Sequence, residues 1–389
     1  MPRKSSVSRS LGLLLMFILA GLVARAAEAP DPWPAASAID PFMGDYDGTF
    51  TPQGAAAVKA HGRVIALGNH NYQVVLYPMA YPQDDGKQRI ELSGTTGGKR
   101  LDFIWTLHFA GNANGAAWRG EVQVEKLNAT SPLGKFALKH VARRSPTLGA
   151  RPPLGAVALM PYAADKPTTL EAWKRFGADT PAEWEIRPDA AVQVTHGDIV
   201  SKQKFGDSQI HVEFCLPFMP LETGQGRANS GVYVANRYEV QVLDSFGLAA
   251  QDNDCGAIYT VSKPLVNAEL PPLAWQTYDI IFRAARFDAN CDVTELPLLT
   301  VYLNGVKVQN GAPVTNPTAG WMPGHTKRGE LRLQDHLNPV RYRNVWVLER
   351  GDIPYQPNTE LAALVQAKGQ KAGAPARKSA TRKRNRVAQ

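Results

Sequence analysis

Residues 229–244 read NSGVYVANRYEVQVLD and contain two short runs in which apolar and polar side chains alternate. This period of two predicts β-strands at Ser230–Ala235 and Tyr238–Leu243. Further runs with strand character lie between residues 165 and 350, at Val192–Thr195, Asp207–Leu216, Ala257–Thr260, Trp275–Arg283, Leu298–Leu303, Glu330–Gln334 and Arg341–Leu348. About nine or more short strands of this kind favour a two-sheet sandwich or jelly roll.

A first block, residues 40–147, has the same alternating pattern, with Gly, Asn and Asp clusters between the runs. It predicts a smaller antiparallel β domain in front of the second block, which spans residues 165–352. Within the second block, Asn304-Gly305 predicts a two-residue hairpin turn, because a type I′ turn needs positive φ at both central residues. One or two helical turns are expected at Leu170–Phe176, and a short capped helix after Asn358.

The two ends of the chain account for its net positive charge, because they hold twelve basic residues and no acid. Residues 1–27 combine basic residues, a short apolar run and small residues, which is typical of a secretory signal peptide, and an uncleaved anchor is the alternative. Residues 28–39 form a Pro/Ala-rich linker, and residues 367–389 form a basic tail with eight Lys and Arg and no acid. This composition predicts a disordered tail.

The distribution of charge removes the support that the total charge gives to a nucleic-acid partner. The net charge of +8 would favour nucleic acid or an anionic membrane as partner. The tail and the signal segment together hold twelve of the basic residues, so the remainder carries a net charge of −4. We therefore expect an exported protein, periplasmic or extracellular, that does not bind nucleic acid. Its tail is either merely solvated or in contact with an anionic envelope surface.

The cysteines and short motifs add little. Export permits one disulfide among Cys215, Cys255 and Cys291, and Cys255–Cys291 is the expected pair because Cys215 lies in an expected strand. The sequence has no Cys/His metal spacing, nucleophile elbow, Walker loop or dinucleotide-binding glycine motif. Chemistry must therefore come from polar residues on a sheet face.

The clearest polar face follows from the run at residues 238–244. Val240 and Val242 would point to the core, while Glu239 and Gln241 would project together from the other face and Asp244 would end the strand. A solvated sheet face would look the same. Other candidates share expected strands or strand ends, where core packing or turn formation is the alternative role: Asn229, His211, Glu213, Tyr259, Trp275, Arg332, Gln334, His336 and Arg343.

Read in order, these segments resemble the 3-keto-disaccharide hydrolase domain family over roughly residues 180–350. The resemblance rests on ordered motifs: KFGD at 204–207, HVEF at 211–214, GRANSGVY at 226–233, RYEVQVLDS at 237–245, CGAIY at 255–259, WQTYDI at 275–280, NGV at 304–306, LQDH at 333–336 and RNVW at 343–346. It implies an all-β fold, a concanavalin-like jelly-roll sandwich, preceded here by the smaller antiparallel β domain that some exported members carry.

The resemblance also implies activity on 3-keto-glycosides, with a carbohydrate as substrate. A ketone at C3 acidifies the C2 proton, so a base can remove it, the C1 substituent leaves, and water adds. On this basis Glu239, Asp244 and His336 are assigned the acid–base work. Residues assigned to substrate binding are Asn229, Gln241, Tyr259, Trp275, Gln334 and Arg343. Second-tier candidates are His211, Glu213 and Arg332. No residue spacing demands a cofactor, although a divalent metal held by carboxylate and His could stabilise the enolate.

Two other classes of function fit the same sequence. The sandwich could bind carbohydrate without cleaving it, as a lectin does, because the same fold supports both roles. The first β domain and the basic tail would also suit an envelope scaffold. Binding of glycans without turnover would distinguish the first alternative, and loss of envelope association after removal of the tail would distinguish the second.

Overall fold

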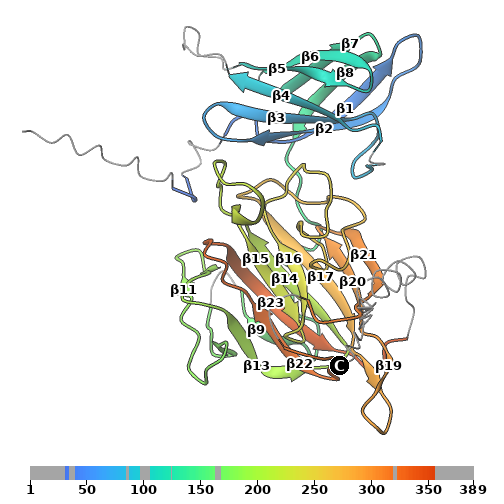
Figure 1. Ribbon diagram of the computed structural model, residues 1–389. Coiled ribbons are helices and arrows are strands. Elements are labelled where there is room, and N and C mark those ends of the chain that lie inside the picture. The colour runs from blue at the N-terminus through green and yellow to red at the C-terminus, as the bar shows by residue number, and fades with distance from the viewer. Residues whose placement is uncertain are drawn as a thin grey trace, which may run out of the picture. The chain divides into compact units, whose positions relative to one another are not determined.

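The computed structural model is built from β-strands throughout the part of the chain that it describes (Figure 1). That part comprises residues 31–34, 40–84, 87–96, 106–123, 125–162, 168–318 and 322–354. Within these ranges the one helical element is a 3₁₀ turn at Gly224–Gly226, so the all-β prediction is confirmed. The expected signal peptide, terminal helix and basic tail lie outside the described residues, as does most of the first linker.

The first block forms a closed barrel of eight antiparallel strands in chain order. β1 pairs with both β2 and β8, so closure leaves no sheet edge exposed. Its interior is filled by one apolar cluster that includes Tyr46, Val64 and Phe136. The strands are β1 (Gly44–Pro52), β2 (Val58–Ala66), β3 (Asn71–Tyr77), β4 (Ile90–Thr96), β5 (Thr106–Ala113), β6 (Ala116–Gln123), β7 (Lys126–Ser131) and β8 (Gly134–Val141).

The second block is a sandwich of two sheets around a second apolar core. The five-stranded sheet has the order β10 (Trp173–Arg175), β13 (Ile199–Phe205), β22 (Gly329–Leu333), β15 (Ser230–Val234) and β16 (Tyr238–Val242). The larger sheet has the order β11 (Glu185–Ile186), β12 (Val192–Gln193), β23 (Arg341–Glu349), β14 (Ser208–Cys215), β17 (Trp275–Arg283), β20 (Leu298–Leu303) and β21 (Val306–Pro313), with β9 (Val157–Met160) also paired to β23. A small hairpin joins β18 (Arg286–Phe287) and β19 (Val293–Glu295).

The predicted strands agree with strands of this sandwich, with one exception. β17 and β20 have the predicted bounds, and the predicted turn at Asn304-Gly305 has φ values of 52° and 79°. The expected strand at Ala257–Thr260 is wrong, because only Ile258 forms isolated bridges there. The expected helical turns at Leu170–Phe176 are wrong as well, since Trp173 starts β10 and is buried in the core.

The expected disulfide is also wrong. All three cysteines are free: Cys215 and Cys255 are buried, and Cys291 is exposed. The Cys255 thiol lies 3.2 Å from the Tyr278 hydroxyl inside the sandwich, whereas Cys291 lies in the turn between β18 and β19. Sequence spacing could not separate a core thiol from a surface one.

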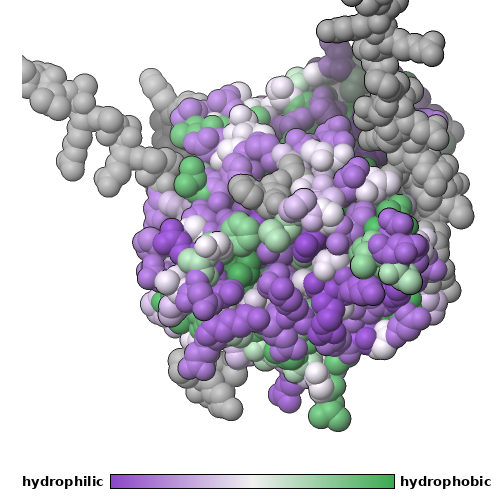
Figure 2. Space-filling view, turned by 60° about the horizontal axis from the view of Figure 1, so that its bottom comes forward, coloured by the Kyte–Doolittle hydropathy of each residue, from purple (hydrophilic) through white to green (hydrophobic). Residues whose placement is uncertain are grey.

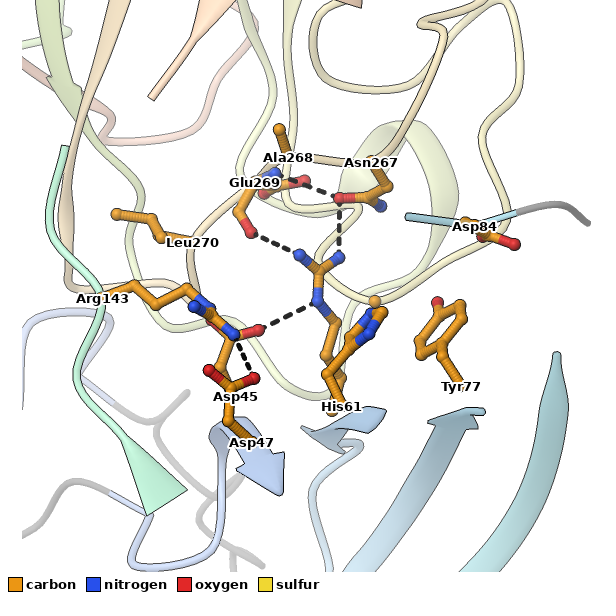
Figure 3. Close-up of polar contacts among 12 residues, drawn as sticks. Asp45, Asp47, His61, Tyr77, Asp84, Arg143, Asn267, Ala268, Glu269 and Leu270 are labelled. Atoms are coloured by element: carbon orange, nitrogen blue, oxygen red, sulfur yellow. Dashed lines mark hydrogen bonds and ion pairs between the residues drawn. The ribbon is translucent and has the colours of Figure 1, made fainter. Parts of the chain in front are cut away.

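Hydrogen bonds of buried Arg63 connect strand β2 of the barrel to the segment before β17; Figure 3 labels their partners Asp45, Asn267 and Glu269. Arg63 is 2% exposed, and its Nε donates to Asp45 Oδ1 at 3.1 Å. Its two Nη atoms donate to Asn267 Oδ1 at 3.1 Å and to the Glu269 carbonyl at 3.3 Å. Burial raises the pKa of Asp45, while the charges of Arg63 and Arg143 oppose that rise. Arg63 therefore satisfies a buried carboxylate and buried acceptors from the second block at once.

Among the described residues, no helix is long and apolar enough to span a membrane. On the face shown in Figure 2 the coloured residues are mostly hydrophilic, and the hydrophobic ones form small separate patches. Scattered patches of this kind are normal on a folded surface and do not indicate a docking face.

We predict that Arg63→Met lowers the free energy of unfolding by about 3–5 kcal/mol, because removal of one partner leaves a buried charge without its pair. The loss should shrink as the pH is lowered. In the variant the pKa of folded Asp45 rises further above its unfolded value, so a protonated Asp45 removes the penalty. Denaturant unfolding followed by circular dichroism at several pH values measures both effects.

Lys59→Met is the matched control, because Lys59 lies in the same strand and is exposed. Equal stability of the two variants would contradict the role given to Arg63.

Candidate functional site

One face of the five-stranded sheet carries several of the polar residues that the sequence singled out. In β16, Val240 and Val242 belong to the core, so Glu239 and Gln241 project from the opposite face, as predicted. Strand β22 follows the same rule, with Leu331 and Leu333 in the core and Arg332 on the polar face.

Backbone register aligns Glu239 and Arg332 with Tyr233, a third polar side chain on this face. Tyr233 in β15 pairs with Glu239 in β16 on one side and with Arg332 in β22 on the other. Cross-strand partners project from the same face of a sheet, so the three side chains form a row across it. We call these three residues the polar row.

Glu239 is the group best suited to exchange a proton near neutral pH. Its side chain is 3% exposed, and burial raises its pKa to about 7. The hydrogen bond from Tyr233 and the charge of Arg332 limit this rise, and the charge of Asp198 adds to it. A carboxyl group with this pKa can act as base or as acid at pH 7.

Tyr233 links Glu239 to the neighbouring strand. Its hydroxyl donates to Glu239 Oε2 at 2.8 Å and accepts from Gln334 Nε2 at 3.2 Å. Burial and the charge of Glu239 raise the pKa of the Tyr233 phenol, so it stays protonated and remains a donor. The other amide atom, Gln334 Oε1, is buried and has no hydrogen-bond partner among the described residues. This oxygen could accept a hydrogen bond from a sugar hydroxyl.

Arg332 places a positive charge next to this pair. Its guanidinium is fully buried, 3.8 Å from the ring centre of Tyr233 and 4.5 Å from that of Phe176. Arg332 Nε lies 3.2 Å from Asp198 Oδ2, and the Asp335 backbone N–H donates to Asp198 Oδ1 at 2.8 Å. Burial raises the pKa of Asp198 against these contacts. The site therefore holds a fixed cation in surroundings from which water is largely excluded.

Gln241 fits both protonation states of Glu239. Its side-chain amide has an atom 3.0 Å from Glu239 Oε1. With nitrogen in that position the amide donates to the carboxylate, and with oxygen there it accepts from the carboxylic acid. Gln241 can thus keep its hydrogen bond to Glu239 in both protonation states through a flip of its side-chain amide.

Gly231 gives the carboxyl group its space. A Cβ at this position would lie 2.3 Å from Glu239 Oε1 and 3.1 Å from the Tyr233 ring. No side chain fits there while Glu239 keeps its position.

Two further predicted residues lie beside the row. The Tyr259 backbone N–H donates to the Glu239 carbonyl at 3.1 Å, and burial and the charge of Glu239 raise the pKa of its phenol. Asn229 is 1% exposed, and its Nδ2 donates to the Gln225 carbonyl at 2.8 Å. Its backbone N–H donates to Asn338 Oδ1 at 2.7 Å. Asn229 therefore holds the loop before β15.

Asp244 has a structural partner in this fold. Its Oδ2 accepts from Arg227 Nε at 2.7 Å, and its Oδ1 accepts from the Phe246 backbone N–H at 3.3 Å. Arg227 also donates to the carbonyl of Ala66 at 3.3 Å. The buried ion pair stabilises the chain after β16, and acid–base work by Asp244 stays an untested prediction.

His336 does not share the regular face predicted for it. Alternation would align it with Arg332 and Gln334, but β22 ends at Leu333 and the chain turns there. His336 is exposed in this loop, and its charge acts on Asp198. A role as proton donor at the rim stays a prediction.

Four predicted residues lie on the other side of the sandwich and are not brought together with Glu239. They project from the outer face of the larger sheet, as the alternating core residues of β14, β17 and β23 show. They are His211, Glu213, Trp275 and Arg343.

This outer cluster holds the segment between the two blocks against the sheet. Glu213 accepts from Arg343 Nε at 2.8 Å, from Asn344 Nδ2 at 2.8 Å and from the Gly149 N–H at 2.5 Å. Burial alone would raise the pKa of Glu213, but these bonds and His211 lower it to about 2. Arg343 also stacks on Trp275, 3.9 Å from its ring centre. These contacts give Glu213, Arg343 and Trp275 a structural role in the packing of this face.

Sequence reasoning missed two members of the site. Asp198 lies outside the expected strands and motifs, and Phe176 falls in a segment expected to be helical. The single clue to Phe176 was its apolar character, because its contact with Arg332 depends on the pairing of β10, β13 and β22. Within the described residues, no group of three or more His, Cys, Asp or Glu side chains could hold a metal ion. The metal option therefore rests on the sequence alone.

Comparison with known proteins identifies the sandwich. Residues 165–348 match the family model described as a 3-keto-alpha-glucoside-1,2-lyase-like domain. A crystal structure from Parabacteroides distasonis, of a protein provisionally assigned as a glycosyl hydrolase, is 34% identical; the match covers 51% of this chain and 84% of that one, with a TM-score of 0.44.

Two further structures from P. distasonis carry the same provisional assignment, at 18% and 19% identity. They cover 47% and 46% of this chain and 90% and 95% of their own, with TM-scores of 0.36 and 0.35, and add nothing to the assignment. A search of curated proteins finds no match. On the match of residues 165–348 to the family model, the sandwich belongs to the 3-keto-alpha-glucoside-1,2-lyase-like domain family.

Proposed function

We propose that the protein is an exported enzyme that cleaves 3-keto-glycosides by elimination and hydration, with Glu239 as the proton-transferring group. The observation that carries this proposal is the buried Glu239 carboxyl, whose pKa is raised to about 7 beside a buried arginine. Export rests on the sequence pattern of residues 1–27 alone.

The proposed reaction balances without an oxidant or reductant. The base takes the proton from C2, the electron pair forms the C1–C2 double bond, and the C1–O bond to the leaving group breaks with a proton supplied to that oxygen. Water then adds its hydroxyl to C1 and a proton returns to C2. The net result is hydrolysis, with a 3-keto sugar and a free alcohol as products.

The polar row supplies what the first step requires. Glu239 in its ionised form accepts the C2 proton, and Gln241 can stabilise both the ionised and the protonated group. The positive charge of Arg332 favours the enolate that develops at the C3 oxygen. Gln334 Oε1 can accept a hydrogen bond from a sugar hydroxyl. Tyr233 fixes the direction of the Glu239 carboxyl through its hydrogen bond.

We predict that Glu239→Gln lowers kcat/KM for a 3-keto-glucoside by about 10²-fold or more, the usual scale for loss of a general base. In the unmodified protein kcat/KM should rise with pH through about 7 and level off above it, because only ionised Glu239 accepts the proton. The variant should lack this limb. Steady-state kinetics across pH 5–9 gives both results.

Glu185→Gln makes the same chemical change at an exposed position and serves as the control. Turnover by Glu239→Gln at the level of this control would refute the role of Glu239.

His336→Ala tests the source of the leaving-group proton. If His336 donates this proton, the variant should lose about 10²-fold in kcat/KM for a poor leaving group such as a sugar, and much less for a nitrophenyl group that needs no proton. Equal losses for the two leaving groups, or none, would remove His336 from the mechanism.

Gly231→Ala tests the position of the carboxyl group. The added Cβ must displace Glu239 or the Tyr233 ring, so we expect kcat to fall about 10-fold or more while the protein stays folded. Gly351→Ala is the matched control, because its Cβ would meet no atom within 4 Å and the glycine has no positive φ. Steady-state kinetics gives kcat for both variants, and a thermal melt shows whether they are folded. An unchanged kcat in a folded Gly231→Ala would contradict the position given to the Glu239 carboxyl group.

A further inference from the structure

The line of paired residues that contains the polar row continues through β13 to β10, at the edge of the five-stranded sheet. Arg332 pairs with Val200 in β13, and Val200 pairs with Lys174 in β10. Neighbouring strands lie about 4.8 Å apart, so Arg332 is about 10 Å and Val200 about 14 Å from Glu239 across the sheet. A substrate placed over Glu239 could therefore extend along this face beyond Arg332.

A pocket of about 400 Å³ opens at the far end of the row. Val200 and Glu330 form part of its floor, and both project from the face that carries Glu239. Lys204 and Arg237 also line it. Its volume lies in the range of small-ligand sites.

Two residues that line the pocket contact the polar row directly. Phe176 and Asn236 line the pocket, and both contact Arg332, whose guanidinium lies 4.5 Å from the Phe176 ring centre and 3.4 Å from Asn236 Oδ1. On its other side the same guanidinium covers Tyr233, the hydrogen-bond partner of Glu239. Two buried side chains, Tyr233 and Arg332, thus lie between the reacting carboxyl group and the pocket.

We infer that this pocket is the subsite for the second sugar of a disaccharide substrate, the half that leaves. The inference rests on the proposed function, which puts the 3-keto sugar over Glu239. The rest of the substrate must then extend from C1, and the face continues into the pocket in one direction.

The lining suits a sugar. The half-buried ring of Phe176 and the side chain of Met322 offer apolar surface for the C–H face of a pyranose. Lys204 and Arg237 can donate to hydroxyl groups, while Glu330 can accept from them. A methyl or other small leaving group would reach none of these groups.

Ala178→Trp fills the pocket without touching Arg332. Ala178 lines the pocket, is exposed, and uses its backbone N–H to bind the Arg175 carbonyl at 3.3 Å, a bond that any residue can make. Ala55→Trp is the matched control. Ala55 is exposed in a barrel turn, and its N–H binds the Pro52 carbonyl at 3.2 Å.

The measurement is kcat/KM for a 3-keto-disaccharide divided by kcat/KM for methyl 3-keto-glucoside. Ala178→Trp should lower this ratio about 10-fold or more, and Ala55→Trp should leave it within about twofold. A ratio that Ala178→Trp does not change, or an equal loss for both substrates, would overturn the subsite.

The test also separates this inference from the proposed reaction. If the unmodified protein turns over neither substrate, the proposed reaction fails. Calorimetry with the unreactive parent disaccharide then measures whether the pocket binds a sugar. Binding that Ala178→Trp abolishes and Ala55→Trp preserves would support the subsite. No binding, or binding that both variants retain, would overturn it.

Discussion

The hydrogen bond from the Tyr233 hydroxyl to the Glu239 carboxyl is the contact around which the site is arranged. It exists because β15 and β16 pair with these two residues directly opposite each other. The same register leaves room for the carboxyl group over Gly231, where a side chain would collide with it. On the other side of Tyr233, the pairing with β22 brings Arg332 onto the face of the phenol ring.

Two opposing effects set the protonation of Glu239. Burial disfavours the ionised form, and Tyr233 and Arg332 favour it, with the result that its pKa lies at about 7. Glu213 on the opposite side of the sandwich is also buried but has a pKa of about 2, because contacts with His211, Asn344, Arg343 and Gly149 all favour its ionised form. The number of donors therefore distinguishes a carboxylate fixed in its ionised form from one able to exchange protons.

Alternation along the strands predicted much of this. It identified β16 and the outward direction of Glu239 and Gln241, because one apolar residue in two suffices to assign the faces of a strand. It could not tell which sheet a strand joins, so residues of both outer faces were grouped as one site. Glu213 and Arg343 lie in the larger sheet, and only long-range pairing shows this. For His336 the pattern was extended past the end of β22, where it no longer applies.

The account depends most on proton transfer at C2, and a substrate labelled there tests it directly. With a 3-keto-glucoside deuterated at C2, elimination by Glu239 predicts a primary isotope effect on kcat/KM and a product in which solvent hydrogen replaces the deuterium. Glu239→Gln should abolish the exchange. Cleavage with deuterium retained at C2 and no isotope effect would contradict the account and indicate direct displacement at C1.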